Sequence, residues 1–162
     1  AAGGVGSCAV QIAAAVGARP LCAASPGNHD YLRRLGASEV FDYHAVGWAE
    51  QVRAAAPGGV DLLFDGAGGQ TRAQAIGAVR DGGRAVSIVL AGPPAETERG
   101  ITAESFAAHV DRRRLAALSR LVDEGGLRAQ VDAVLPLEQA REALARVAGQ
   151  HTRGKVVLRI GR

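Results

Sequence analysis

The feature that most constrains this chain is a glycine-rich hexapeptide, Ala1-Ala2-Gly3-Gly4-Val5-Gly6. It fits G-x-G-x-x-G with alanine in place of the first glycine, a pattern typical of the turn between a strand and a helix that binds a dinucleotide. Gly3 would let the backbone approach a pyrophosphate, and Gly6 would let the helix pack closely on a strand. The free N–H groups and the positive dipole end of the helix would hold the anion. The same string also occurs by chance in flexible termini and tight turns, so the surrounding elements decide its meaning.

Apolar residues recur at helical spacing directly after this loop. They predict an amphipathic helix whose buried face is formed by Val5, Cys8, Ala9, Ile12, Ala13 and Val16. A loop of this type needs a strand in front of it, yet the sequence starts inside the loop. We therefore expect the chain to be a piece of a longer protein, and the absence of methionine agrees with this.

Length and composition indicate one globular domain with a sizeable core. The 162 residues are 48% apolar and 22% charged, which is typical of a soluble protein. No apolar run approaches the roughly 20 residues needed to cross a bilayer, so a cytoplasmic protein is the default expectation. The net charge of +3 comes from dispersed arginines. Their only run, residues 112–114, is more typical of the solvated start of a helix than of a nucleic-acid-binding patch.

The cysteines and histidines do not predict a metal site. Cys8 and Cys22 belong to no C-x-x-C pair and lie within apolar patterns, so both are interpreted as buried free thiols. The four histidines have no ligand-pair spacing.

Strand and helix patterns alternate along the chain. The predicted strands are 19–24, 40–43, 60–65, 84–89, 130–134 and 155–160, and the predicted helices that follow the first one are about 28–36, 46–56, 71–79, 112–124 and 137–147. This alternation predicts an α/β fold, a doubly wound parallel sheet (Rossmann fold) lacking its first strand. A strand order of 3-2-1-4-5-6 puts that absent strand at the centre, so we expect a gap in the sheet and poor stability or irregular closure. Residues 90–100 are expected to form a long loop, and part of 101–110 an edge strand.

Three polar residues are candidates for the adenosine end of a dinucleotide site. An acidic residue about 20 positions after the glycines would bind a ribose 2′-hydroxyl, but Ser25 stands there instead. Ser25 and Asn28 donate hydrogen bonds without charge, which favours NADP over NAD, and Tyr43 is placed to close over the same end. Each of them could equally be an ordinary turn or cap residue.

Four motifs together resemble the medium-chain dehydrogenase/reductase superfamily, closest to its zinc-independent quinone oxidoreductase-like branch. They are the hexapeptide 1–6, Leu35-Gly36-Ala37 with Asp42-Tyr43, strand 60–65 with Gly66 and Gly68, and the terminal Arg153-Gly154-Lys155-Val156-Val157-Leu158. The resemblance spans essentially the whole chain. It implies the nucleotide-binding half of an enzyme that transfers hydride from NADPH to a quinone, an enone or another activated carbonyl compound. It also implies an upstream barrel domain that completes the catalytic cleft, and a homodimer formed through the edge strand near 101–110.

The resemblance assigns cofactor-binding roles residue by residue. Gly3 to Gly6, with Ala2, would hold the pyrophosphate, and the 2′-phosphate would be surrounded by Ser25, Asn28 and Tyr43. The ribose would be lined by Asp65 and Gly66, and the nicotinamide would face Ile88 to Leu90, Val89 included. The family uses the residue at Asp65 to organise its loop, so no catalytic residue is assigned. The family often has a Lys or Arg near Gly27 or Asn28, and this chain does not. Arg33 and Arg34, one helical turn further on, are the candidate substitutes.

Two alternatives remain open at this point. The chain could belong to an enoyl reductase domain of a polyketide or fatty-acid synthase, which shares this half and its motifs. It could also be a nucleotide-binding Rossmann module without chemistry, since only an upstream barrel would distinguish an enzyme. A methyltransferase is disfavoured, because Ser25 does not supply the acidic ligand residue such a site requires.

Overall fold

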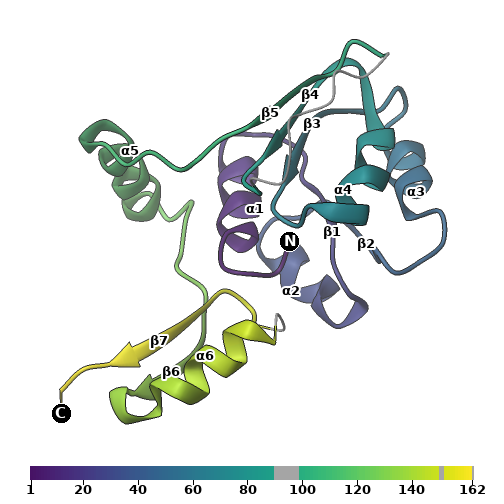
Figure 1. The fold of residues 1–162 in the computed structure, drawn as a ribbon. Helices are drawn as coiled ribbons and strands as arrows, with labels where there is room; N and C mark the ends of the chain where they lie inside the picture. Colours follow the sequence, from purple (N-terminus) through teal and green to yellow (C-terminus); the bar gives the residue numbers. More distant parts are fainter. Residues whose placement is uncertain (90–98, 150–151, 162) are drawn as a thin grey trace. The chain divides into compact units, whose positions relative to one another are not determined.

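A computed structural model describes residues 1–89, 99–149 and 152–161 (Figure 1). The chain divides into two compact units. The first unit comprises Ala1–Val40 and Arg112–Arg162, and the second comprises Phe41–Asp111. The helices of the first unit are α1 (Gly6–Ala15), α2 (His29–Arg34), α5 (Arg112–Asp123) and α6 (Ala140–Ala148). Its strands are β1 (Leu21–Ala23), β6 (Val131–Pro136), β7 (Lys155–Arg159) and most of β2 (Glu39–Phe41). The second unit contains α3 (Trp48–Ala55), β3 (Val60–Asp65), α4 (Gly69–Ala75), β4 (Val79–Ser87) and β5 (Thr102–Ser105).

Helix α1 follows the glycine loop as predicted, but the prediction of its buried face was wrong. The buried residues of the helix are Ser7, Val10 and Gln11. Val5 is 50% exposed, Val16 is 69% exposed, and the other predicted face residues, Cys8 included, are only half-buried. Gln11 can be buried because its side-chain amide is fully used in hydrogen bonds to the backbone of Ser7 and Arg128. Hydrogen bonding, which a hydrophobic pattern does not report, therefore sets the orientation of this helix.

The core of the first unit gathers around α1, β1, α2 and the start of β2. It consists of Ala2, Val10, Cys22, Ala24, Tyr31, Leu32, Ala37 and Val40. Leu32 is fully buried, which contributes about 2 kcal/mol of hydrophobic stabilisation. Helix α2 ends at the predicted glycine: Gly36 has a φ of +105°, and the next N–H, of Ala37, donates to the Leu32 carbonyl at 3.0 Å.

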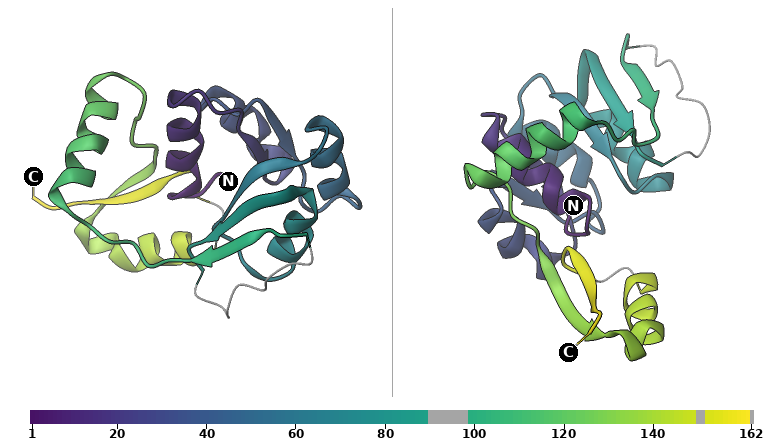
Figure 2. Two further views of the ribbon diagram at one scale, coloured as in Figure 1. Left: turned by 90° about the horizontal axis from the view of Figure 1, so that it is seen from above. Right: turned by 90° about the vertical axis from the view of Figure 1, so that its left-hand side faces the viewer.

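The C-terminal segment of the first unit forms a small sheet of its own. Strands β6 and β7 are parallel, with Leu135 paired to Leu158, and α6 packs beside them (Figure 2). Helix α5 forms over its predicted range, yet its apolar residues Leu115, Leu118 and Val122 are exposed. An amphipathic pattern thus predicted this helix correctly without predicting burial of its apolar stripe.

The second unit is organised by a parallel sheet in the order β3-β4-β5. Its core contains Val79, Ala85 and Ile101. Strand β4 starts at Val79, earlier than the predicted Arg84, because the expected turn at 81–83 lies within the strand as a bulge. Val60 pairs with Val79 but Leu62 pairs with Arg84, so the intervening residues loop out of the ladder. As predicted, the segment after 100 supplies an edge strand, although β5 covers only Thr102–Ser105.

Parallel strands alternating with helices confirm the predicted α/β class. Within the described residues, the strands form three sheets, β1-β2, β3-β4-β5 and β6-β7, rather than one continuous sheet. The order β3-β4-β5 is that expected for one half of a doubly wound sheet. The loop predicted at 90–100, Leu90 included, falls almost wholly outside the described residues.

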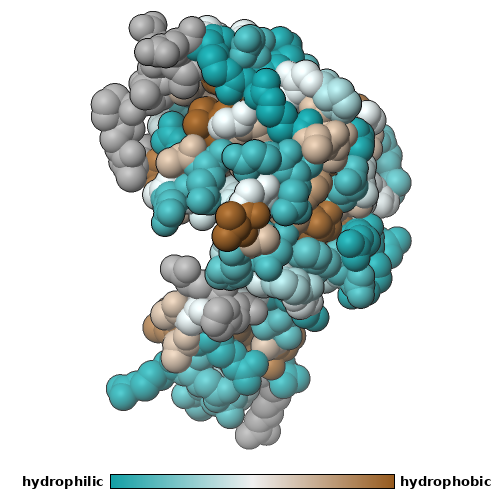
Figure 3. Space-filling view, turned by 90° about the vertical axis from the view of Figure 1, so that its right-hand side faces the viewer, coloured by the Kyte–Doolittle hydropathy of each residue, from teal (hydrophilic) through white to brown (hydrophobic). Residues whose placement is uncertain are grey.

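The surface carries no extended apolar face in the view of Figure 3, where apolar residues form small separate patches among hydrophilic ones. Among the described helices, none is both long enough and apolar enough to cross a membrane.

Candidate nucleotide-binding site

The glycine loop is fixed by pairing with the segment just before β7. Gly3 forms a parallel bridge with Gly154, whose N–H donates to the carbonyl of Ala2 at 3.0 Å. Gly154 has a φ of +87°, and a Cβ there would lie 2.3 Å from the carbonyl oxygen of Gln130. A Cβ on Gly6 would lie 2.1 Å from the carbonyl oxygen of Ala1. Both positions therefore require glycine for close approach of two backbone segments.

The same loop has the properties of an anion site. Within the described residues, the first backbone bond of α1 runs from the Ser7 N–H to the Gly3 carbonyl at 2.9 Å, so the N–H groups of Val5 and Gly6 donate to no backbone carbonyl. A Cβ on Gly3 would meet nothing within 4 Å, which leaves open space beside the backbone. On the other side, a Cβ on Gly4 would lie 2.7 Å from Nζ of Lys155. Free N–H groups, a helix N-terminus and an ammonium group suit a pyrophosphate. Sequence reasoning quoted Lys155 only as part of a motif and missed its place at the loop.

Ser25 and Asn28 form one hydrogen-bonded turn in the first unit. Asn28 Nδ2 donates to Ser25 Oγ at 3.0 Å, and the Asn28 N–H donates to the Ser25 carbonyl at 2.9 Å. The turn is joined by a distant residue, Arg153, whose Nε donates to Asn28 Oδ1 at 2.9 Å and whose Nη2 donates to the Gly27 carbonyl at 2.6 Å. Sequence reasoning searched for a cation near Gly27 along the chain and missed this one. The only available signal was its motif, Arg153-Gly154-Lys155.

The second unit carries the other predicted loop, which the carboxylate of Asp65 organises. Asp65 Oδ1 accepts hydrogen bonds from the N–H groups of Ala67 (2.9 Å) and Gly68 (2.8 Å), and Oδ2 accepts one from Ser87 Oγ (2.7 Å). Burial alone would raise the pKa of Asp65, but these hydrogen bonds, with Arg72 Nε 3.9 Å away, hold it below its usual value. Ser87 was missed from sequence, where it reads as one more residue of a buried strand.

Ile88 and Val89 pack against the glycines of that loop. A Cβ on Gly66 would lie 3.6 Å from Ile88 Cδ1, and a Cβ on Gly68 would lie 3.1 Å from Val89 Cγ1. The Ile88 N–H donates to the Asp65 carbonyl at 3.0 Å. The structure thus brings Asp65, Gly66, Ile88 and Val89 together at the carboxyl ends of β3 and β4, where ligands bind in open α/β sheets.

Tyr43 lies after β2, in the second unit, and not at the end of the strand as predicted. β2 ends at Phe41, and Tyr43 is 37% exposed with its ring 4.1 Å, centroid to centroid, from that of His44. It lines a hollow of about 450 Å³ together with Gly47, Thr71 and Gln74. Within its own unit, Tyr43 is therefore accessible to a ligand.

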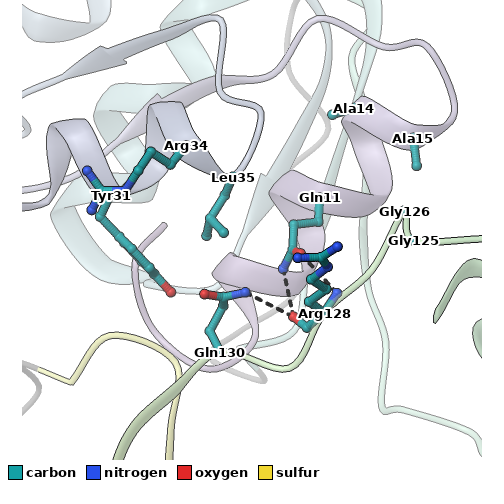
Figure 4. A pocket seen from close by; sticks show the side chains of 10 residues that line it. All are labelled: Gln11, Ala14, Ala15, Tyr31, Arg34, Leu35, Gly125, Gly126, Arg128 and Gln130. Carbon is teal, nitrogen blue, oxygen red and sulfur yellow. Dashed lines mark hydrogen bonds between the residues drawn. The ribbon is translucent and has the colours of Figure 1, made fainter.

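A separate hollow of about 510 Å³ in the first unit lies between α1, α2 and residues 125–130 (Figure 4). Figure 4 shows the Gln11 amide reaching the backbone of Arg128, where its Nε2 donates at 3.1 Å and its Oε1 accepts at 3.0 Å. Arg34, one of the predicted substitute cations, lines this hollow and not the Ser25 turn. Arg33, the other, is paired with Asp30 at 2.8 Å.

The described residues contain no group of three His, Cys, Asp or Glu side chains that could hold a metal ion. Cys22 is buried, and burial raises the pKa of its thiol to about 11. The described residues therefore do not fit a zinc site.

Comparisons with known proteins identify the family of the chain. A family model described as "Zinc-binding dehydrogenase" matches residues 35–158. The chain is 32% identical over 142 residues to a probable mitochondrial zinc-binding oxidoreductase of Arthroderma benhamiae, covering 83% of this chain and 42% of that protein. It is 26% identical over 185 residues to the mitochondrial NAD(P)H oxidoreductase RTN4IP1 of Mus musculus, covering 99% of this chain and 46% of that protein. The chain therefore spans about half the length of the curated relatives it matches.

Solved structures give the same result. An NAD-dependent alcohol dehydrogenase superposes with a TM-score of 0.89 at 30% identity, over 99% of this chain and 49% of that one. The quinone oxidoreductase from Coxiella burnetii superposes with a TM-score of 0.82 at 29% identity, over 99% of this chain and 50% of that one. The CurK enoyl reductase superposes with a TM-score of 0.82 at 25% identity, over 99% of this chain and 52% of that one. With the family match covering most of its length, this chain belongs to the zinc-binding dehydrogenase family and corresponds to the C-terminal part of a medium-chain dehydrogenase/reductase.

Proposed function

We propose that this chain is the cofactor-binding half of an NADPH-dependent oxidoreductase that transfers hydride to a quinone, an enone or a related carbonyl acceptor. The observation that carries the proposal is the glycine loop at the start of α1. It has open space beside Gly3, N–H groups of Val5 and Gly6 that donate to no backbone carbonyl among the described residues, and Lys155 close to Gly4. The similarity to a quinone oxidoreductase supports the acceptor class.

When bound, the nicotinamide would supply the hydride, so the protein needs to contribute binding, orientation and exclusion of water. We assign the pyrophosphate to Ala2–Gly6 and the adenosine 2′-phosphate to Ser25 and Asn28, and the resemblance to the superfamily adds Tyr43 to the residues that bind the 2′-phosphate. The resemblance to the superfamily assigns the ribose to Asp65 and Gly66 and the nicotinamide to Ile88 and Val89. In this assignment Asp65 holds its loop and takes no part in proton transfer, because both its oxygens already accept hydrogen bonds.

Preference for NADP rests on the uncharged Ser25–Asn28 turn. A carboxylate at this place would repel a 2′-phosphate, whereas Asn28 and Ser25 present neutral polar groups. We further propose that the catalytic barrel domain belongs to the part of the protein outside this chain, that the protein acts in the cytoplasm, and that two copies pair through the edge near residues 101–110. The position of β5 at the edge of its sheet and the exposure of Phe106 support the pairing.

The experiment that tests the cofactor is a titration of the purified chain with NADPH and NADH, followed by cofactor fluorescence and by thermal shift. Tighter binding of NADPH is the expected result. A folded chain that binds neither nucleotide would refute the proposal.

Size-exclusion chromatography of wild type and of Phe106→Lys tests the pairing of two copies. We expect the wild type to elute as a dimer and the Phe106→Lys variant to elute as a monomer.

An enoyl reductase of a polyketide or fatty-acid synthase is the second candidate, favoured by the similarity to the CurK enoyl reductase. Both candidates use the same cofactor half, so the longer protein must be assayed. Reduction of an enoyl thioester in preference to a quinone would support the synthase alternative.

A further inference from the structure

We propose that Arg153 is the residue that recognises the cofactor 2′-phosphate and so determines coenzyme specificity. The inference rests on the proposed function, because it names the cation that the Ser25–Asn28 turn lacks along the chain. It identifies a residue far away in sequence, 125 positions after Asn28.

The guanidinium of Arg153 lies on the turn itself. Nε donates to Asn28 Oδ1 at 2.9 Å and Nη2 donates to the Gly27 carbonyl at 2.6 Å, while Asn28 Nδ2 is bonded to Ser25 Oγ at 3.0 Å. Two of the three polar residues expected around a 2′-phosphate, Ser25 and Asn28, are thus linked to one cation. The chain of hydrogen bonds runs from Arg153 through Asn28 to Ser25.

The backbone on either side holds Arg153 at this place. Its N–H donates to Asp132 Oδ1 at 3.1 Å, and the next residue, Gly154, donates to the Ala2 carbonyl at 3.0 Å. The guanidinium also lies 5.9 Å from the centre of the Tyr31 ring. Because Gly154 joins the glycine loop, the residue that would bind the 2′-phosphate is anchored to the loop that would bind the pyrophosphate. This connection would couple recognition of the pyrophosphate to recognition of the 2′-phosphate.

The charge of Arg153 is available for an anion. Its two acceptors at the turn are neutral oxygens, and among residues 1–89, 99–149 and 152–161 no carboxylate forms an ion pair with its guanidinium. Arg153 is exposed, and an arginine has five N–H donors, of which two are used here. A planar guanidinium with free donors matches a phosphate group. The other nearby arginines are less suited, since Arg33 is paired with Asp30 and Arg34 lines a different hollow.

The decisive experiment measures the Kd of four nucleotides for wild type, Arg153→Gln and the control Arg34→Gln. NADPH and adenosine 2′,5′-bisphosphate carry the 2′-phosphate, whereas NADH and adenosine 5′-monophosphate do not. Arg153→Gln should raise the Kd of NADPH and of adenosine 2′,5′-bisphosphate by roughly 10- to 100-fold, the loss expected for a charge-assisted hydrogen bond. It should change the Kd of NADH and of adenosine 5′-monophosphate by about twofold at most. Arg34→Gln should leave all four unchanged.

A second variant keeps the test decisive if Arg153→Gln does not fold. Asn28→Asp places a carboxylate against Arg153. The carboxylate neutralises the charge of Arg153 and repels a 2′-phosphate, so this variant should bind NADPH more weakly while its binding of NADH stays intact. Equal loss of all four nucleotides in Arg153→Gln, or no loss of NADPH in either variant, would overturn the inference while leaving the proposed function in place. A folded wild type that binds no nucleotide would refute the proposed function itself.

Discussion

The carboxylate of Asp65 should be the most costly single group to remove from the second unit. It is 6% exposed, and Asp65→Ala would leave the N–H groups of Ala67 and Gly68 and the hydroxyl of Ser87 without their acceptor. Hydrogen bonds to a charged acceptor contribute about 1.5–3 kcal/mol each, but loop relaxation and entering water recover part of that, so we expect a loss of about 3–5 kcal/mol. Asp65→Asn keeps one acceptor oxygen and should cost about 1–3 kcal/mol.

The assay is urea unfolding followed by tryptophan fluorescence. Trp48 is the only tryptophan, is 4% exposed and lies in the same unit as Asp65, so its signal reports on that unit. The control is Asp61→Asn, which removes an exposed ion pair with Arg80 (2.7 Å) and should cost at most about 0.5 kcal/mol. Equal losses for the Asp65 and Asp61 variants would refute the reasoning, because burial and multiple hydrogen bonding would then carry no extra stabilisation.

The pH dependence gives the same prediction a second test. The pKa of Asp65 is lower in the folded chain than its usual value of 3.8, so the unfolded chain binds the proton more readily. The stabilisation is therefore present above pH 3.8 and is lost as the pH falls from there through the folded-state pKa. The difference in unfolding free energy between wild type and Asp65→Asn should narrow over that acidic range and stay constant above it.

The remaining predictions concern the first unit. Gly154→Ala should lower the free energy of unfolding by about 2–4 kcal/mol, because a Cβ would lie 2.3 Å from the Gln130 carbonyl oxygen at a φ of +87°. The matched control Gly125→Ala, at a φ of +77° with open space around it, should lose only about 1–2 kcal/mol, and far-UV circular dichroism during denaturation measures both. Gln11→Leu should cost about 1–3 kcal/mol by leaving the Arg128 backbone groups unpaired, and a loss no larger than that of the exposed Gln51→Leu would contradict this. Cys8 should react with a thiol reagent at pH 8 well before Cys22, whose pKa of about 11 keeps it protonated; equal rates in the folded chain would contradict the burial of Cys22.

Local patterns in the sequence predicted most of the elements. The strand at Val60–Asp65 and the helix at Arg112–Asp123 were predicted within one residue, since a short apolar run and a 3.6-residue period, each followed by glycine, mark them clearly. The start of β4 was mistaken because Asp81-Gly82-Gly83 has the composition of a turn, and only strand pairing shows that it is a bulge. The face of α1 was mistaken because the burial of Gln11 depends on the Arg128 backbone, which lies 117 residues away.

The same distinction explains which site residues could be predicted. Spacing within one short segment was enough to make Gly3, Gly6, Ser25 and Asn28 candidates, and the family resemblance added Asp65 and its loop. Arg153 and Lys155 could not be found in this way, because the residues that they contact, Asn28 and Gly4, lie more than 120 positions earlier in the chain, and the Gly3–Gly154 bridge joins the two segments. The Ser25–Asn28 turn offers only neutral groups of its own to a doubly charged phosphate, so the positive charge must come from another part of the chain. A predicted phosphate site without a local cation is therefore a reason to search the rest of the chain for an arginine. An arginine next to a glycine of positive φ, such as Arg153 beside Gly154, can supply that charge from a segment outside any helix or strand.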